Sequence, residues 1–384
     1  MRVSLVHDYL TQHGGAERVL EALHDLYPTA PVLTSVADLD ALPPFYRSWT
    51  IRESPLGAMP GAVRFHRALV PIYPALFRAF ARELRDVDLI ISDSSAWSHH
   101  APAPHGAAHL CYCHSPARFL YGDAGYLTPA GIPRALRPTT SAVFASLRRL
   151  DRQAASRVDR YIANSRTVAA RIKAAYGREA TVIYPPVDLE RFRGLATSGE
   201  PADWCLVVSR LVPHKRIDLA VTAFTRMGLP LKVIGEGRAE TALRRLAGPT
   251  VEFLGRLDDD ATAHALASCR ALILPASEDF GITAVEAQAA GRPVIAFGAG
   301  GALETVVAGE TGTFFTEPTV ESLVDAVDGL SRTRWDPALA RTNAERFGLG
   351  RFQNQLRHEV DVTLHDRFGA RSFGAAGRTG GQLT

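Results

Sequence analysis

The organisation of this chain is decided by ten residues, Ser277-Glu278-Asp279-Phe280-Gly281-Ile282-Thr283-Ala284-Val285-Glu286. The apolar run before them, Ala271-Leu272-Ile273-Leu274-Pro275, predicts a buried strand, and the alternation from Ala284 to Ala290 predicts a helix that ends at Gly291-Arg292-Pro293. Two carboxylates therefore stand eight positions apart across a strand-to-helix turn. Glu278 lies in the loop, and Glu286 lies roughly one to two turns inside the helix.

The start of that helix favours binding of an anion. Phe280, Gly281 and Ile282 bring backbone N–H groups to a helix N-terminus, which carries a partial positive charge and unpaired donors. Acids beside such a turn suit a ligand with both hydroxyl and phosphate groups, such as a nucleotide sugar. The alternative is an ordinary capped helix with two solvated acids, and the spacing alone leaves both interpretations open.

Composition indicates a soluble globular protein of two domains. The chain has 384 residues, of which 46% are hydrophobic and 22% charged, and its net charge of +3 does not argue for a nucleic-acid partner. Its four cysteines give no disulfide framework, and Cys111-x-Cys113-His114 lacks the second half of a zinc site, so we expect no metal. We find no signal peptide and no run of the roughly 18 apolar residues that a membrane span needs. These features predict a cytoplasmic protein that can make peripheral contact with the inner membrane. They carry no information on the oligomeric state.

The first half alternates predicted strands and helices. Strands are predicted at 2–8, 31–35, 87–92, 107–114, 159–165 and 181–188, and a long arginine-rich helix at 140–157. A Gly14-Gly15 loop follows the first strand and allows close approach of a ligand to the backbone, although a purely structural turn is the alternative. Several polar residues fall at carboxyl ends of strands, where open α/β sheets bind ligands: His7, Asp8, Asp93, His114 and Arg118.

Residues 61–85 mix arginines with apolar and aromatic residues. Pro71 and Pro74 interrupt the stretch. A basic amphipathic segment of this kind can lie on an anionic membrane or face a lipid-linked acceptor. The alternative is an ordinary pair of surface helices with one buried face.

The strand–helix alternation restarts near residue 204, which predicts two doubly wound parallel-sheet (Rossmann-like) α/β domains with a ligand cleft between them. We predict a first domain over 1–193, a linker over 194–202 and a second domain over 203–348. A final helix at 349–367 and a disordered tail at 368–384 complete the chain.

Two cations follow the first strand of the second domain. Arg210 and Lys215 can both donate to a diphosphate, and Lys215 is one of three lysines in a chain that otherwise uses arginine. The glycine-rich loop Gly298-Ala299-Gly300-Gly301 adds another anion-friendly strand end. Two solvated surface cations are the alternative.

Together these motifs resemble the retaining GT-B glycosyltransferases of family 4 (glycosyl transferases group 1), over nearly all of the chain to about residue 367. Cys111-Tyr112-Cys113-His114-Ser115-Pro116-Ala117-Arg118-Phe119, with Gly300-Gly301-Ala302-Leu303-Glu304-Thr305, is similar to a mannosyltransferase branch of bacterial O-antigen and exopolysaccharide assembly that uses GDP-mannose. Thr283-Ala284 departs from that branch, which has a larger apolar residue and a proline there.

The resemblance implies a role for each matching residue. Arg210 and Lys215 would bind the donor diphosphate and stabilise the leaving group, Glu286 would hold the ribose, and Glu278 would contact the sugar, helped by the N–H groups of Phe280, Gly281 and Ile282. Gly14 and Gly15 would let the first domain close against the phosphates, and His114 would lie beside the reacting sugar carbon. No metal or other cofactor is implied. The final helix would pack back on the first domain.

The expected function is therefore that of a hexosyltransferase in cell-surface polysaccharide synthesis. It would move mannose from GDP-mannose, with retention of configuration, to a hydroxyl of a saccharide or lipid-linked saccharide, and His7, Asp8 and Arg118 are the candidates for binding that acceptor. The alternatives are a UDP-sugar-dependent transferase acting on a small molecule, an epimerase or phosphorylase, and a non-catalytic protein that binds sugar nucleotides.

Overall fold

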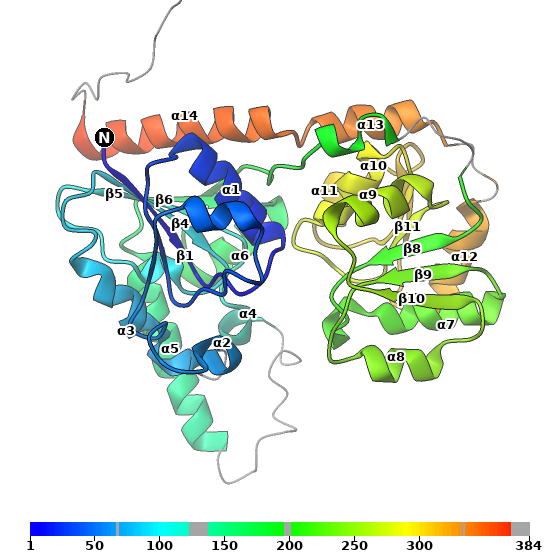
Figure 1. The fold of residues 1–384 in the computed structure, drawn as a ribbon, viewed down its shortest axis with the longest axis horizontal. Helices are drawn as coiled ribbons and strands as arrows, with labels where there is room; N and C mark the ends of the chain where they lie inside the picture. Colours follow the sequence, from blue (N-terminus) through cyan, green and yellow to red (C-terminus); the bar gives the residue numbers. More distant parts are fainter. Residues whose placement is uncertain (67–68, 123–136, 196–200, 331, 333–334, 370–384) are drawn as a thin grey trace, which may run out of the picture. The chain divides into compact units, whose positions relative to one another are not determined.

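Two parallel β-sheets, each flanked by helices, form the framework of the chain (Figure 1). The computed structural model describes residues 1–66, 69–122, 137–195, 201–330, 332 and 335–369. The first sheet has seven strands in the order β3-β2-β1-β4-β5-β6-β7, and the second has six in the order β10-β9-β8-β11-β12-β13. This arrangement confirms the predicted pair of doubly wound α/β sheets.

The elements of the N-terminal half are β1 (Val3–His7), α1 (Gly15–Leu26), β2 (Val32–Thr34), β3 (Ile51–Glu53), α2 (Ala62–Phe65), α3 (Tyr73–Arg78), β4 (Leu89–Ser94), the short 3-10 helix η5 (Ser98–His100), β5 (Ala108–Cys113), α4 (Arg118–Tyr121), α5 (Arg137–Ala155), β6 (Arg160–Ala163), α6 (Arg166–Tyr176) and β7 (Ala180–Val182). Strands β1, β4 and β5 are buried along their whole length, as expected of central parallel strands covered on both faces.

The elements of the C-terminal half are β8 (Cys205–Val208), the 3-10 helix η10 (Pro213–Lys215), α7 (Ile217–Met227), β9 (Leu231–Ile234), α8 (Glu240–Leu246), β10 (Val251–Gly255), α9 (Asp259–Ser268), β11 (Leu272–Leu274), α10 (Ile282–Ala289), β12 (Val294–Phe297), α11 (Ala302–Thr305), β13 (Gly312–Phe315), α12 (Val320–Leu330), α13 (Pro337–Glu345) and α14 (Leu349–Phe368).

The second sheet is the middle layer of three. Because side chains alternate along a strand, Leu206 and Leu272 pack in one core with α9 and α10, whereas Val207 and Ile273 pack in another with α7 and α12. Figure 1 shows α7 and α8 on one side of this sheet and α9 and α10 on the other. The layers leave the loops after β8, β11 and β12 at one edge of the sheet, where the predicted donor residues lie.

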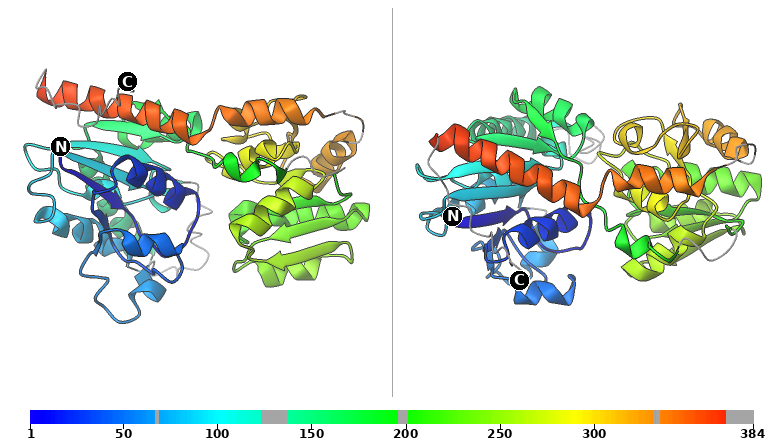
Figure 2. Two further views of the ribbon diagram at one scale, coloured as in Figure 1. Left: turned by 45° about the horizontal axis from the view of Figure 1, so that its top comes forward. Right: turned by 90° about the horizontal axis from the view of Figure 1, so that it is seen from above.

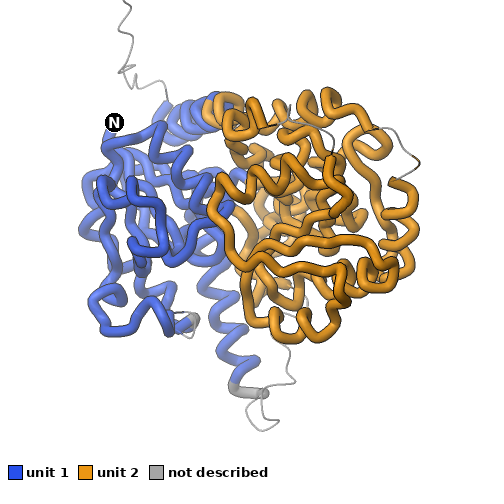
Figure 3. Tube along the Cα trace, turned by 45° about the vertical axis from the view of Figure 1, so that its right-hand side comes forward, with its two compact units in different colours: residues 1–113, 132–162, 354–384 blue, residues 114–131, 163–353 orange. Residues whose placement is uncertain are grey.

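Contacts divide the chain into two compact units (Figure 3). Unit 1 comprises residues 1–113, 132–162 and 354–384, and unit 2 comprises residues 114–131 and 163–353. The division falls inside α14, whose residues from Asn354 onward belong to unit 1. It also falls at β6, so residues 163–193, which we predicted to be part of the first domain, group with unit 2. The predicted domain limits at 193 and 203 remain predictions.

Figure 2 shows α14 as the long helix at the red end of the colour scale. Inside unit 1, ion pairs tie its C-terminal part to β6 and to the residue before that strand. The guanidinium of Arg160 donates to Glu359 at 3.2 Å and to Asp366 at 2.6 Å, and Arg367 donates to Asp159 at 3.1 Å. The predicted final helix is therefore present. The predicted tail lies outside the described residues from 370 onward.

In the basic stretch 61–85, three large aromatic side chains pack inside the protein and are not free to face a membrane. The stretch forms α2, α3 and short 3-10 turns, and Tyr73, Phe77 and Phe80 are almost completely buried. Its arginines at 64 and 82 remain exposed. In the described part of the chain, the length and hydropathy of every helix fall short of those of a membrane span.

Candidate functional site

The acidic turn lies between β11 and α10, as predicted. Gly281 caps α10 in the left-handed conformation (φ 87°), which a glycine adopts without strain, and the helix begins at Ile282. The turn is fastened to the glycine loop because the Gly301 N–H donates to the Glu278 carbonyl at 2.8 Å. Phe280 is 3% exposed, and its ring packs against that of Phe347, so this residue anchors the turn in the core of unit 2.

Two predicted catalytic residues come together at this turn. The Lys215 ammonium, at the end of η10, lies 2.5 Å from Oε2 of Glu278, and both side chains are less than one-fifth exposed. The turn that carries the acid and the loop that carries the lysine therefore meet at one edge of the second sheet. A partly desolvated ion pair of this kind can open to a ligand that offers an anion to Lys215 and a hydroxyl to Glu278.

The surroundings of His214 show that positive charge accumulates here. Burial, together with the charges of Lys215, Arg118, Arg210 and Arg238, lowers the pKa of His214 to about 4. All these residues belong to unit 2. Such a concentration of cations beside a helix N-terminus is suited to a diphosphate.

Asp279 is a site residue that the sequence reasoning missed. Its carboxylate pairs with both Arg118 and Arg171. Arg118, predicted to bind the acceptor, is thus held by the residue next to Glu278, inside unit 2. The position of Asp279 between Glu278 and Phe280 was the available signal, but nothing in the sequence identifies its two arginine partners.

Glu304 is a second residue whose role was missed, although its motif was recognised. Its carboxylate accepts the backbone N–H groups of Arg166 at 2.8 Å and Thr167 at 3.1 Å, and the Tyr184 hydroxyl at 3.1 Å. It thereby caps the first turn of α6, where unpaired N–H groups and the helix dipole favour an anion.

The predicted roles of Glu286, His114 and Arg210 remain predictions. Glu286 lies within α10 and is 6% exposed. His114 follows β5, and its backbone carbonyl accepts from the Asn164 amide at 3.2 Å. Arg210 is exposed in the loop after β8.

In unit 1, His7 lies at the end of β1 in a buried acidic environment. Its Nδ1 is 2.8 Å from Asp93, and its Nε2 is 3.8 Å from Glu17 in the first turn of α1. Burial lowers the pKa of His7, but the hydrogen bonds and charges of Asp93 and Glu17 outweigh it and raise the pKa to about 10. His7 is therefore an imidazolium at neutral pH. Gly14 is the N-cap of α1 and Gly15 its first residue, at the predicted loop.

Asp8 has a structural task in this unit. It is 2% exposed, and its two oxygens accept the backbone N–H groups of Ser95, Trp97 and Ser98 at 2.6–2.8 Å. The carboxylate thus fixes the loop that follows β4. Its predicted part in acceptor binding is untested.

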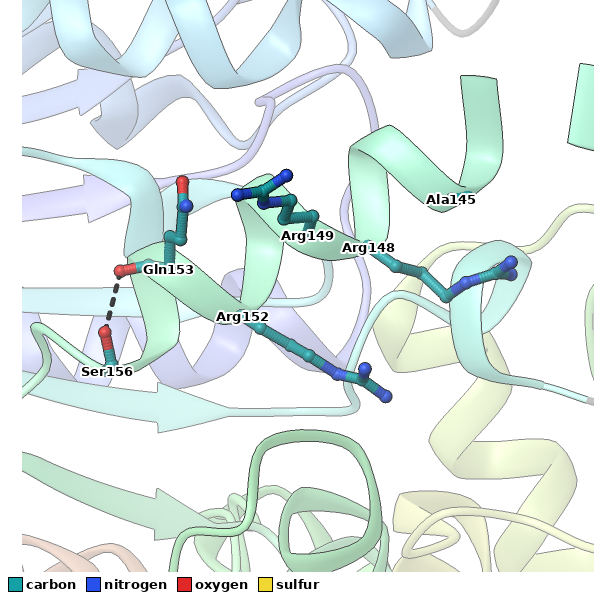
Figure 4. A pocket seen from close by; sticks show the side chains of 6 residues that line it. All are labelled: Ala145, Arg148, Arg149, Arg152, Gln153 and Ser156. Carbon is teal, nitrogen blue, oxygen red and sulfur yellow. Dashed lines mark hydrogen bonds between the residues drawn. The ribbon is translucent and has the colours of Figure 1, made fainter. Parts of the chain in front are cut away.

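A separate hollow of about 470 Å³ runs along α5 (Figure 4). Arg148, Arg149, Arg152, Gln153 and Ser156 line it together with Ala145, and the Ser156 hydroxyl donates to the Gln153 carbonyl at 3.0 Å. None of the predicted donor residues borders this hollow.

Comparison with known proteins places these features in a family. A family model described as "Glycosyltransferase Family 4" matches residues 13–191, and one described as "Glycosyl transferases group 1" matches residues 196–346. A GDP-mannose-dependent mannosyltransferase of Mycobacterium tuberculosis that acts on phosphatidylinositol monomannoside is 36% identical over 208 residues, 46% of this chain and 53% of that protein. The enzyme of Corynebacterium glutamicum named for the monoacylated substrate is 36% identical over 165 residues, 35% of this chain and 43% of that protein. The match thus spans about half the length of these relatives.

Solved structures share the fold over about 95% of the chain. HepE of Anabaena, in complex with UDP and glucose, superposes with a TM-score of 0.70 at 18% identity and covers 94% of this chain and 99% of its own. Sucrose-phosphate synthase of Thermosynechococcus elongatus gives a TM-score of 0.69 at 18% identity over 95% of this chain and 100% of its own.

The two parallel α/β sheets and the similarity to these solved structures give the chain the GT-B fold. With both family models matched in sequence, the chain belongs to glycosyltransferase family 4.

Proposed function

We propose that this glycosyltransferase transfers mannose from GDP-mannose, with retention of configuration, to a hydroxyl of a saccharide or lipid-linked saccharide in cell-surface polysaccharide synthesis. The names of the two mannosyltransferase relatives support the choice of donor. The observation that carries the proposal is the 2.5 Å pair of Lys215 and Glu278 beside the N-terminus of α10.

Lys215 and Arg210 bind the diphosphate of the donor. The bond between the sugar C1 and the diphosphate oxygen breaks, and the negative charge that develops on that oxygen is stabilised by these fixed cations and by the N–H groups at the start of α10. Once the donor is bound and Lys215 has exchanged Glu278 for the diphosphate, the cations stay in place during bond breaking, so this stabilisation requires no metal ion.

Glu278 leaves Lys215 when the donor arrives and accepts hydrogen bonds from hydroxyls of the transferred sugar. Glu286 accepts from the ribose hydroxyls, and His114 orients the sugar at its reacting carbon. The acceptor hydroxyl attacks C1 on the face that the diphosphate leaves, and its proton passes to the departing phosphate oxygen, so no protein nucleophile is required.

A donor screen tests the assignment directly. GDP and GDP-mannose should raise the unfolding temperature of the protein, whereas UDP, ADP and TDP compounds should do so less, because only a bound ligand stabilises the folded state. If UDP compounds raised the unfolding temperature and GDP compounds did not, the donor would be a UDP-sugar and the GDP-mannose assignment would be wrong.

Lysine variants test the proposed chemistry. Lys215→Ala should reduce transfer by roughly 10²–10³-fold because a charge-stabilising donor is lost. Lys232→Ala is the matched control, since Lys232 also faces a carboxylate, Glu252 at 3.7 Å, but stands on β9 away from the turn. Equal, near-normal transfer by both variants would overturn the proposed role.

The acceptor is proposed to reach the enzyme at the cytoplasmic face of the membrane. The exposed arginines of residues 61–85 would then contact anionic lipid, worth about 1 kcal/mol each near such a surface. Sedimentation with vesicles containing anionic lipid should deplete the protein from solution at low salt and release it at high salt. Equal sedimentation with neutral vesicles would contradict this part of the proposal.

A further inference from the structure

A group of three buried side chains in unit 1 has no part in the proposed transfer. His99 and His100 lie on η5, and Asp151 lies in α5. Among the described residues, they form a set of ligand atoms within 4.8 Å of one another. All three side chains are between 0% and 3% exposed.

The three ligand atoms lie close enough together to share one metal ion. Nε2 of His99 and Nε2 of His100 each lie 3.0 Å from Oδ1 of Asp151. An ion about 2.1 Å from each of these atoms would see them at about 90°, the angle of an octahedral shell. The tetrahedral shell typical of zinc needs donor atoms about 3.4 Å apart, so the ligands would separate by about 0.4 Å on binding zinc. Two imidazoles and one carboxylate on one side of the ion are a recurrent donor set for divalent transition metals.

The outer contacts of His99 support the same assignment. Its Nδ1 lies 3.2 Å from the Ser94 hydroxyl, which orients the ring with Nε2 toward Asp151. A histidine that ligates a metal commonly uses its second ring nitrogen in this way.

The carboxylate of Asp151 points to a bound cation independently of these distances. Its Oδ2 is buried and has no hydrogen-bond partner in the part of the chain that the structure describes. An unpaired carboxylate oxygen in a protein interior is costly, because it has lost its water without replacement. A cation bound by both carboxylate oxygens satisfies it and completes a set of four donor atoms.

We propose that His99, His100 and Asp151 bind a divalent transition-metal ion such as Zn²⁺. The bound ion would stabilise the fold of unit 1. The ion would join η5 to α5. Trp97 and Ser98, next to these histidines, hold the Asp8 carboxylate through their N–H groups, so the ion would stabilise the loop at the carboxyl edge of the first sheet. Its complete burial separates it from the transfer chemistry.

Metal content is the first test. The purified full-length protein, loaded with Zn²⁺ and freed of excess ion, should contain about one ion per chain by elemental mass spectrometry. Asp151→Asn and His100→Gln should retain at most about a tenth of that amount. His24→Gln is the matched control: His24 is a largely buried histidine of the same unit, packed on Trp49, and its variant should keep the ion.

The wild-type protein alone gives a second readout, which holds even where a variant does not fold. A chelator should lower its unfolding temperature, and Zn²⁺ or Co²⁺ should restore it, with visible absorption of protein-bound Co²⁺. The proposal fails if the loaded wild type contains no ion and its unfolding temperature ignores the chelator, or if Asp151→Asn retains the full amount. The three residues would then be a hydrogen-bonded cluster without metal.

Discussion

Replacing Gly301 with alanine should displace the acidic turn between β11 and α10 without removing any charged side chain. Gly301 has φ −64° and ψ −20°, which alanine adopts freely, so the substitution acts through space alone. An added Cβ would lie closest to Phe280 Cα and 2.6 Å from the carbonyl oxygens of Asp279 and Phe280. These are backbone atoms, so no side chain can rotate to make room.

The displacement needed sets the size of the effect. Carbon atoms pack at about 3.5–4.0 Å, so the turn or the glycine loop must move by roughly 1 Å. Overpacking of this kind costs about 1–3 kcal/mol of stability. The Gly301 N–H also holds the Glu278 carbonyl at 2.8 Å, so the movement passes directly to the acidic turn. A shift of about 1 Å in a positioned group can reduce activity by up to ~100-fold.

Calorimetry with the nucleoside diphosphate that wild type binds best, combined with unfolding in urea, measures both effects. Gly301→Ala should bind about 10- to 100-fold more weakly. The matched control is Gly329→Ala in α12, where an added Cβ meets no atom within 4 Å. Because alanine favours a helix, this variant should gain about 0.5–1 kcal/mol and bind normally. Wild-type affinity and stability in Gly301→Ala would refute the close approach of loop and turn.

Three further predictions follow from other contacts. Asp279→Asn should cost about 1–2 kcal/mol in urea unfolding because two partly exposed arginine pairs are lost, whereas Asp40→Asn, which removes a pair whose acid is 90% exposed, should cost less than ~0.5 kcal/mol. His7 contributes stability that is fully present below its unfolded pKa of about 6.5 and is lost as pH rises through its folded pKa of about 10. The unfolding temperature of wild type should therefore fall between these pH values more steeply than that of Asp93→Asn, and parallel curves would contradict the pairing. Glu304→Ala should cost about 1 kcal/mol and speed amide exchange in the first turn of α6, and unchanged exchange there would exclude the cap.

The alternation of strands and helices was predictable because central parallel strands are buried on both faces and are therefore continuous apolar runs. Strand β3, Ile51-Arg52-Glu53, was missed for the converse reason. It stands at the edge of the first sheet beside β2 alone, and Arg52 and Glu53 are exposed. Backbone hydrogen bonds to the neighbouring strand hold such an edge strand in place. Its side chains form no apolar pattern from which a strand could be predicted.

The burial of residues 61–85 was harder to predict, because an amphipathic segment has the same sequence pattern whether its apolar face meets a lipid or the protein. Phe77 is buried completely and Tyr73 nearly so, in contact with Trp97. The sequence pattern predicts that the segment has an apolar face. Which surface covers that face depends on the other elements that the fold places beside it.

The adjacent acids Glu278 and Asp279 show where prediction from sequence reaches its limit. In a turn, successive side chains point in different directions, so neighbours in sequence bind different partners: Glu278 meets Lys215, whereas Asp279 meets Arg118 and Arg171. The lysine could be anticipated, because it is one of three and follows a strand end. The arginines could not, because the other forty positive side chains are alike in the sequence, and only the fold selects two of them. One turn thus collects three cations from three separate segments of unit 2. A substitution in that turn should consequently affect donor binding even where it removes no group that touches the donor.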